Sequence, residues 1–482
     1  MIKPVLKGKN NSHYLRLNIS LSVKKKYNKR KTFSQRGMIM GRKEIRAKRA
    51  LEKNPIEACN EVQKRFYPEL FNRFGRIADP RHQSYITYTG KTMLGQMYYK
   101  GITGIISMQD MTDKFNKPQV VESMAAYMGV ELDEYLPHHV TENDYLERLN
   151  PNELQDTIQD IVYDLIRRKS FDEAKFMGKW IVIIDGTQLY SGDRKINDKC
   201  LERHYNKGTE QETVNYHVDV LEAKIYFGSE LVCSICSEFI ENNGEDAEKY
   251  KGMSEEAQKQ DCEIKGFKRM AEKLRKAFPR LPILLLMDSL YASKPVMDIC
   301  KENKWDYIIR FKDGSIPYIA KEYEDIPEKE RVGNAEYINE IDYEGHKVNF
   351  LKYREETVVD GDITIKTFQW ITNIEITQKN ALKIAKTGRL RWKIENQGFN
   401  RQKNWQGDIT HACNWDEWAL KNHYLMQQIS DFMKQLYEHY ILKKLGIIKK
   451  QKNISSDLLE SFERQLTAED ISRIEMQSIS TN

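Results

Sequence analysis

Two short, wholly apolar runs of this sequence each end on an aspartate. One is residues 181–185, Ile-Val-Ile-Ile-Asp, and the other is residues 283–288, Ile-Leu-Leu-Leu-Met-Asp. Runs of this length without polar residues are typical of central strands buried on both faces. A carboxylate inside such a strand would lose its hydration, so Asp185 and Asp288 are expected at strand ends that face a crevice. Two acids at one edge of a sheet favour a cation site.

A third acid for such a site stands in a segment with helical periodicity, residues 378–402. Divalent hard cations prefer several oxygen ligands, and Glu395 is the best third carboxylate. Arg391 precedes Glu395 by four residues, so both are expected on one helical face. Gln402 should return to that face, with Lys403 beside it. Such a stripe could hold a metal and grip substrate phosphates. It equally suits a surface helix with an ordinary Arg–Glu ion pair, and periodicity alone leaves both interpretations open.

The composition indicates a folded protein of several domains. The chain has 482 residues, of which 40% are hydrophobic and 31% are charged, and this length exceeds what one hydrophobic core usually serves. No apolar run approaches the roughly 20 residues that a membrane helix needs, so no membrane association is expected. The seven cysteines are scattered along the chain, which predicts reduced thiols and a cytoplasmic location.

The net charge of +6 is distributed very unevenly. Residues 1–50 contain 16 Lys and Arg against the single acid Glu44, a charge of +15, so the rest of the chain carries −9. We interpret this segment as a basic arm that neutralises nucleic-acid phosphates and releases their counterions. A solvated tail is the alternative interpretation.

The elements around the acids predict a mixed α/β sheet followed by a β insertion. Further strands are expected at 216–221, 231–235 and 307–311, with helices at 258–278 and 294–304. Three strands followed by helix, strand, helix and strand indicate a mixed sheet with helices on its faces. Residues 330–373 then become strand-like, with hairpin turns expected at Glu344-Gly345 and Asp360-Gly361.

Three motifs together resemble bacterial insertion-sequence transposases of the DDE class. They are Asp185-Gly186-Thr187, the segment Asp288-Ser289-Leu290-Tyr291-Ala292, and the segment Arg391-Trp392-Lys393-Ile394-Glu395-Asn396. The resemblance covers roughly residues 79–436 and implies a ribonuclease H-like core. The β insertion before the glutamate resembles that of the hairpin-forming branch of these enzymes. That branch has a tyrosine where this chain has Gly388 and a lysine where it has Gln402, so the terminal-phosphate clamp is the least secure part of the comparison.

The resemblance implies a domain order. It consists of a basic arm (1–50), a helical DNA-binding region (51–176), the first part of the ribonuclease H-like core (177–315), the β insertion (316–375), the second part of the core with the glutamate helix (376–442), and a helical tail (443–482).

The resemblance also implies two-metal phosphoryl transfer on DNA. Asp185, Asp288 and Glu395 would be the catalytic residues and would hold two Mg²⁺ ions, which Mn²⁺ could replace. Water would cleave the ends of the element, and the freed 3′-hydroxyl would then attack target DNA. The substrates would be double-stranded terminal repeats and target DNA, bound by a homodimer associated with the bacterial nucleoid.

The predicted DNA contacts are mostly basic residues near the glutamate. The expected backbone contacts are Arg389, Arg391, Lys393, Arg401 and Lys403. Trp370, at the end of a predicted strand, could stack on an unpaired base, although a strand tryptophan more often belongs to the core. Two other functions remain open: a non-transposing nuclease of the same fold, and a catalytically silent DNA-binding protein derived from a transposase.

Overall fold

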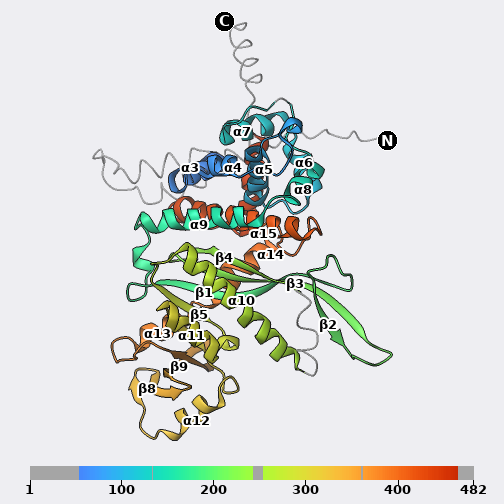
Figure 1. Cartoon of the computed structure of the whole chain (residues 1–482). Coiled ribbons are helices and arrows are strands. Elements are labelled where there is room, and N and C mark those ends of the chain that lie inside the picture. The colour runs from blue at the N-terminus through green and yellow to red at the C-terminus, as the bar shows by residue number, and fades with distance from the viewer. Residues whose placement is uncertain (1–53, 133, 243–252, 360–361, 465–482) are drawn as a thin grey trace, which may run out of the picture. The chain divides into compact units, whose positions relative to one another are not determined.

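The computed structural model describes residues 54–132, 134–242, 253–359 and 362–464 (Figure 1). The predicted basic arm, residues 1–50, and the end of the predicted tail, residues 465–482, lie outside the described residues. Within the described residues no helix is long and apolar enough to cross a membrane.

The described strands form one ten-stranded mixed sheet in which β1 (Trp180–Gly192) lies between β3 (Thr213–Tyr226) and β5 (Ile283–Met287). On one side, β3 pairs antiparallel with β1 and carries both β2 (Leu201–Tyr205) and β4 (Val232–Ile240). On the other side, β5 and β6 (Asp306–Arg310) run parallel to β1. This order confirms the predicted ribonuclease H-like mixed sheet. Strand β2 was not predicted, because its sequence, Leu-Glu-Arg-His-Tyr, is mostly polar.

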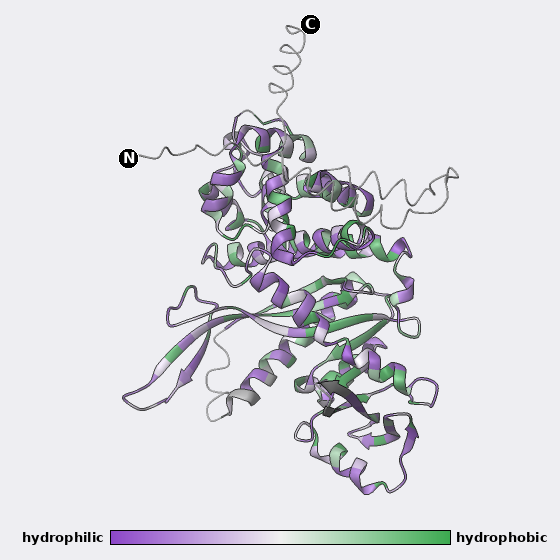
Figure 2. Cartoon of the chain, turned by 180° about the vertical axis from the view of Figure 1, so that it is seen from behind, coloured by the Kyte–Doolittle hydropathy of each residue, from purple (hydrophilic) through white to green (hydrophobic). Residues whose placement is uncertain are grey.

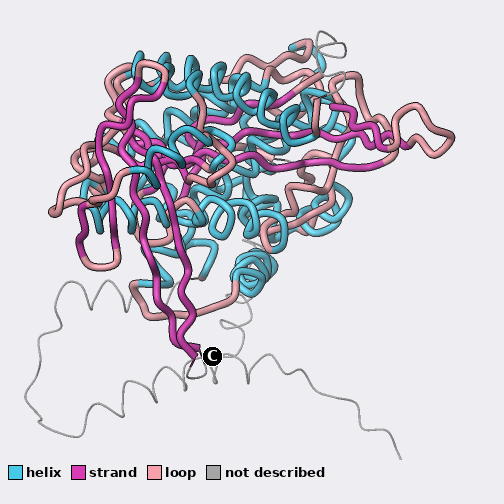
Figure 3. The backbone as a smooth tube through the Cα atoms, turned by 90° about the horizontal axis from the view of Figure 1, so that it is seen from below, coloured by secondary structure: helices cyan, strands magenta, loops and turns pink. Residues whose placement is uncertain are grey.

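The β insertion extends the same sheet. It contains α12 (Pro317–Asp325), β7 (Glu330–Val332), β8 (Ala335–Tyr343), β9 (His346–Val359) and β10 (Asp362–Thr372). Strand β10 pairs antiparallel with β6, and the long β9–β10 pair extends beyond the helices (Figure 3). Glu344 and Gly345 join β8 to β9 with φ angles of 47° and 85°, as a tight hairpin turn requires. The second predicted turn, Asp360-Gly361, lies outside the described residues.

Helices dominate the chain before the sheet and after the insertion. The first group comprises α3 (Pro55–Phe66), α4 (Leu70–Arg76), η1 (Gln83–Tyr85), α5 (Gly90–Thr103), α6 (Met108–Phe115), α7 (Pro118–Met128), α8 (His139–Leu146), α9 (Pro151–Arg167) and η2 (Asp172–Ala174). The later group comprises α13 (Ala381–Arg389), η4 (Ile394–Phe399), α14 (Asn400–Asn404), α15 (Glu417–Tyr437), η5 (Glu438–Lys443) and α16 (Gln451–Glu463). Helix α15 packs against both α5 and α9, so segments distant in sequence share one core (Figure 1).

Helices α10 (Glu255–Ala277) and α15 cover opposite faces of the sheet. Leu221 of β3 lies against Gly266 of α10, whereas its neighbour Glu222 accepts a hydrogen bond from Tyr424 of α15 at 2.9 Å. Successive residues of a strand point to opposite faces, so these two contacts assign the helices to different sides. Green, apolar residues fill the strands where helices cover them (Figure 2). The sheet edge between β1 and β5, where the aspartates stand, is thus reached from both faces.

Candidate active site

Asp185 and Asp288 stand level on two neighbouring parallel strands. The ladder between β1 and β5 pairs Ile183 with Leu286, and each aspartate follows two residues after this last pair. Beyond that point β1 continues along β3, while β5 ends at Met287. The Asp288 side chain accepts a hydrogen bond from the Leu290 backbone N–H at 2.8 Å and caps the short helix η3 (Ser289–Tyr291). The apolar runs therefore deliver both acids to one edge of the sheet.

Arg391 links the predicted glutamate segment to Asp185. The Arg391 guanidinium donates a hydrogen bond from Nη1 to Asp185 Oδ2 at 3.1 Å. Burial raises the pKa of Asp185 to about 6; Arg391 opposes this shift, and the nearby Asp288 carboxylate adds to it. The two aspartates thus repel one another, and a cationic group already lies against one of them.

Glu395 lies in η4, a π-helical turn that contacts β1 and β4. The helical periodicity predicted for residues 378–402 corresponds to two helical segments and not to one regular α-helix. The first is α13, which ends at Arg389, and in the second the π-helical η4 runs directly into α14 at Asn400. A π-helical turn takes about one residue more than an α-helical turn, so later side chains rotate away from their expected face. Gln402 is consequently fully buried and hydrogen-bonded to Gln428 and Asp431, and it does not share the face of Arg391.

A fourth carboxylate, which the sequence analysis missed, lies close to the two aspartates. Glu263 of α10 is 5% exposed and accepts a hydrogen bond from the Tyr291 hydroxyl at 2.9 Å. Burial raises the pKa of Glu263 to about 7; Lys259 and Tyr291 oppose the shift, and Asp288 and Asp185 add to it. No motif singled out Glu263, because it stands in a helix rich in charged residues.

The carboxylates fit a hydrated hard cation better than a closed, dehydrated metal centre. Within the described residues, no three His, Cys, Asp or Glu side chains are arranged to hold an ion directly. Asp185, Asp288 and Glu263 nonetheless supply carboxylate oxygens, and a cation would relieve their mutual repulsion. Mg²⁺ prefers oxygen ligands and retains several waters in protein sites, so widely spaced carboxylates suit it.

Four of the predicted backbone-contact residues remain at least partly accessible. Arg391 contacts Asp185, and Lys403 is half-buried. The Arg389 guanidinium lies 3.9 Å from the centre of the Phe368 ring and 3.3 Å from Glu355. Lys393 pairs with Glu230 at 2.9 Å. These pairs are partly exposed, so a phosphate could compete for the cations.

Arg401 does not fit the predicted DNA contact. Its side chain is 4% exposed, and it forms ion pairs with Asp431 at 2.8 Å and Glu438 at 2.7 Å. The guanidinium also donates to Gln406 at 2.9 Å. The prediction is wrong because the π-helical turn of η4 changes the direction of the side chains that follow it, so Arg401 points into the core. There its N–H groups already donate hydrogen bonds to Asp431, Glu438 and Gln406.

Trp370 is likewise buried, at 2% exposure, so the structure contradicts its predicted stacking on an unpaired base. The indole packs against Gly388, where an added methyl group would lie 2.6 Å from Trp370 Cε2. A larger residue cannot occupy position 388 while Trp370 lies there. Glycine at this position, where the hairpin-forming branch has a tyrosine, therefore has a packing explanation.

Arg310, at the end of β6, is a second residue that the sequence analysis missed. Its guanidinium lies 5.2 Å from the centre of the same Phe368 ring that Arg389 covers. Burial lowers the pKa of Arg310, and the nearby charges of Arg389 and Arg391 lower it further. The guanidinium groups of Arg310, Arg389 and Arg391 therefore form a region where an anion such as a phosphate would be stabilised, and Arg391 connects this region to Asp185. The sequence feature that could have indicated Arg310 is its position directly after the apolar residues 307–309.

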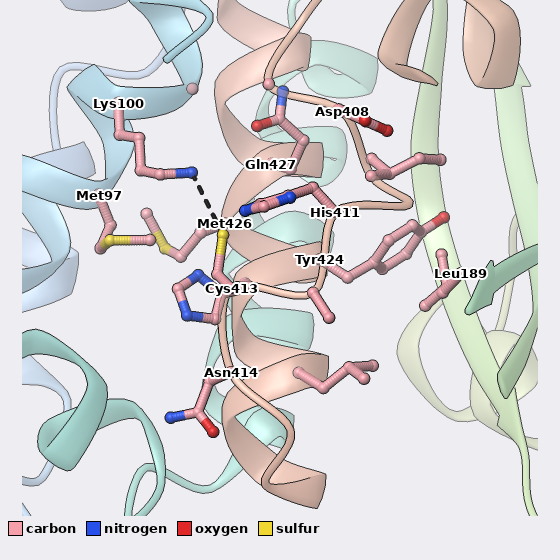
Figure 4. Close-up of a pocket in the computed structure, with 16 residues that line it drawn as sticks. Met97, Lys100, Leu189, Asp408, His411, Cys413, Asn414, Tyr424, Met426 and Gln427 are labelled. Atoms are coloured by element: carbon pink, nitrogen blue, oxygen red, sulfur yellow. Dashed lines mark hydrogen bonds between the residues drawn. The ribbon is translucent and has the colours of Figure 1, made fainter. Parts of the chain in front are cut away.

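A separate hollow lies between α5, α15 and the loop that joins α14 to α15 (Figure 4). Its lining includes Lys100, which donates to Cys413 Sγ at 3.7 Å, and His423. None of Asp185, Asp288 and Glu395 lines it. The predicted acid chemistry and this hollow therefore belong to different parts of the molecule.

We expect His423 to make the fold sensitive to acid. Burial lowers the pKa of His423 to about 3, and the charges of Lys100 and His411 add to the shift. Because the folded-state pKa is below the unfolded value of about 6.5, stability should fall as pH decreases below 6.5. The loss should reach about 1–2 kcal/mol by pH 5 relative to His423→Gln. Urea unfolding of the wild type and of His423→Gln at several pH values measures this loss. If the free energies of unfolding of the two proteins depend on pH in the same way, His423 is not the group that makes the fold sensitive to acid.

The comparison with known proteins agrees with this arrangement. Residues 257–421 match the family model described as the transposase DDE domain. The matched range includes Asp288 and Glu395 and begins after Asp185. A search of curated proteins found no match for the chain. The match spans 165 of the 482 residues, and together with the ribonuclease H-like sheet it supports a DDE transposase domain in this part of the chain.

Proposed function

We propose that the chain is a DNA transposase that cleaves the ends of an insertion sequence and joins the freed 3′-hydroxyl to target DNA. The observation that supports this most is the level placement of Asp185 and Asp288 on parallel strands, with Arg391 donating to Asp185. A carboxylate pair beside a guanidinium combines a cation-binding group with a phosphate-binding group, and phosphoryl transfer needs both.

In this proposal Asp185, Asp288 and Glu395 hold two Mg²⁺ ions, or Mn²⁺ in their place. Bound divalent ions supply an activated nucleophile and stabilise the charge that develops on the leaving oxygen. Arg389, Arg391, Lys393 and Lys403 bind the DNA backbone, and Arg310 joins them because it lies beside Arg389. Such contacts position the DNA without reading its sequence.

The test of this function uses a supercoiled plasmid that carries the DNA flanking the coding region. With Mg²⁺ we expect nicking at the element ends, followed by transfer of the 3′-ends into a second plasmid. EDTA should stop both reactions. Nicking without strand transfer would favour a nuclease, and binding without nicking would favour a silent DNA-binding protein.

We also propose that the chain acts as a homodimer on DNA, associated with the bacterial nucleoid, because two element ends must be processed together. Light scattering of the complex with a DNA end measures its mass. A mass of one protein chain for each paired-end complex would contradict the proposal.

The basic arm should control how DNA affinity depends on salt. Residues 1–50 carry +15, and each neutralised phosphate contributes about −0.9 to the slope of log K against log salt. Deleting them should therefore make the slope shallower by several units. A full-length variant with Gln at the six basic positions of residues 24–31 keeps the arm's length and should flatten the slope partially. Fluorescence anisotropy at several salt concentrations measures both, and unchanged slopes would make the arm a passive tail.

A further inference from the structure

Glu263 approaches the two aspartates from the face of the sheet opposite to that of Arg391. Asp185 faces the side that carries Arg391, and the next residue, Gly186, faces α10. A methyl group added to Gly186 would lie 3.3 Å from Glu263 Oε1. The Glu263 carboxylate therefore lies directly against the strand segment that carries Asp185.

Tyr291 connects Glu263 to the second aspartate. The Tyr291 hydroxyl donates to Glu263 Oε2 at 2.9 Å, and Tyr291 belongs to η3, the short helix that the Asp288 side chain caps. Tyr291 is fully buried, so this hydrogen bond holds the carboxylate in one orientation. Glu263 is thereby tied to both aspartate-bearing segments.

The negative charge of Glu263 has little cationic compensation within the protein. Its cationic neighbour is Lys259, 3.5 Å away and 57% exposed, and such a pair contributes little to stability. By contrast, the carboxylates of Asp431 and Glu438 share the buried guanidinium of Arg401. Burying Glu263 beside two other acids is costly unless a cation is bound there.

We propose that Glu263 is a fourth acidic residue of the cation site, acting together with Asp185 and Asp288 on a hydrated divalent ion. This inference rests on the proposed function. It adds a residue outside the Asp, Asp and Glu set. Glu263 would bind the ion or one of its coordinated waters from the α10 side, and Arg391 lies against Asp185 on the other side.

The test measures Mn²⁺ binding by the full-length protein without DNA, using the electron paramagnetic resonance signal of free Mn²⁺. Glu263→Gln keeps the size of the side chain and an oxygen that can accept from Tyr291. We expect it to weaken Mn²⁺ binding by about 10-fold or more, the size of effect seen when groups supporting a metal site are removed. Glu272→Gln, at an exposed position of the same helix, is the matched control and should leave binding unchanged.

Thermal unfolding separates this role from a structural one. If Glu263 serves the cation, Glu263→Gln should melt in EDTA at the wild-type temperature or higher, and should lose most of the stabilisation that Mn²⁺ gives. A lower melting temperature in EDTA, with wild-type Mn²⁺ affinity, would assign Glu263 to the fold and overturn the inference. Should Glu263→Gln not fold, Glu263→Asp, which retains the carboxylate, should bind Mn²⁺ within a few-fold of the wild type, and complete loss of binding would overturn the inference.

Asp185→Asn and Asp288→Asn distinguish failure of this inference from failure of the proposed function. If both weaken Mn²⁺ binding and Glu263→Gln does not, the inference fails and the proposed function stands. If none of the three weakens Mn²⁺ binding, the cation site itself is wrong, and both proposals fail.

Discussion

Asp185→Asn, Asp288→Asn and Glu395→Gln are each expected to lower Mg²⁺-dependent DNA cleavage by about 1000-fold or more, equivalent to about 4 kcal/mol of activation free energy. Each substitution removes one negative charge and keeps the size of the side chain. The loss should be large because phosphoryl transfer depends on metal ions that only charged oxygens hold well. Plasmid nicking in Mg²⁺, measured as a single-turnover rate, gives the effect directly.

DNA affinity and thermal stability should change little in these three variants. The acids repel phosphates, and the basic residues that would bind the backbone remain in place. Asp193→Asn is the matched control, since Asp193 is an exposed acid just beyond the end of β1, and it should cleave at the wild-type rate. Cleavage at the wild-type rate in any of the three variants would remove that residue from the proposed site.

Arg401→Met is expected to destabilise the fold by about 3–5 kcal/mol, because it leaves two acids in the core without their cationic partner. Asp431 is 2% exposed, and the Glu438 side chain is 16% exposed. Methionine approximates the length of the aliphatic part of arginine, so the loss of unfolding free energy is due mainly to removal of the positive charge. Urea unfolding monitored by circular dichroism measures this free energy.

Lys403→Met provides the comparison for Arg401→Met. Lys403 stands two residues later and is half-buried, and its loss should change the free energy of unfolding by about 0.5 kcal/mol or less. Lys403→Met should instead weaken DNA binding and make the slope of log K against log salt shallower by about 1. The reverse result, a stable Arg401→Met protein with weakened DNA binding, would restore the original assignment of Arg401 as a DNA contact.

The sheet was predictable because its strands carry their own signal. The apolar run that ends at Asp185 forms the first part of β1, and the run before Asp288 forms β5. Each acid follows the last pair of the β1–β5 ladder by two residues, so the two acids are level. The insertion was also predictable, since Glu344-Gly345 marks a hairpin whatever surrounds it. Strand β2 was missed because a mostly polar edge strand has no apolar alternation.

The side chains around the glutamate could not be assigned by counting residues. An α-helical period places Gln402 on the face of Arg391, but the π-helical turn at η4 rotates both Gln402 and Arg401 into the core. Such a turn depends on packing against β1 and β4, and the local sequence does not indicate it. The same holds for Trp370, whose burial depends on the space left by Gly388.

The amino-acid sequence by itself determined the two apolar strand segments that lead to Asp185 and Asp288, because hydrophobic periodicity is a local property. The expected strand end was found at Asp288, whereas Asp185 lies inside β1, which continues along β3 to Gly192. Only the tertiary structure decided which charged groups meet there. It brought Arg391 to Asp185 and placed Glu263 beneath Gly186, and it enclosed Arg401 between two acids. The physical reason is that the sequence around a charged residue does not show whether its side chain faces water or a buried partner. Only the packing of the folded chain distinguishes these two environments.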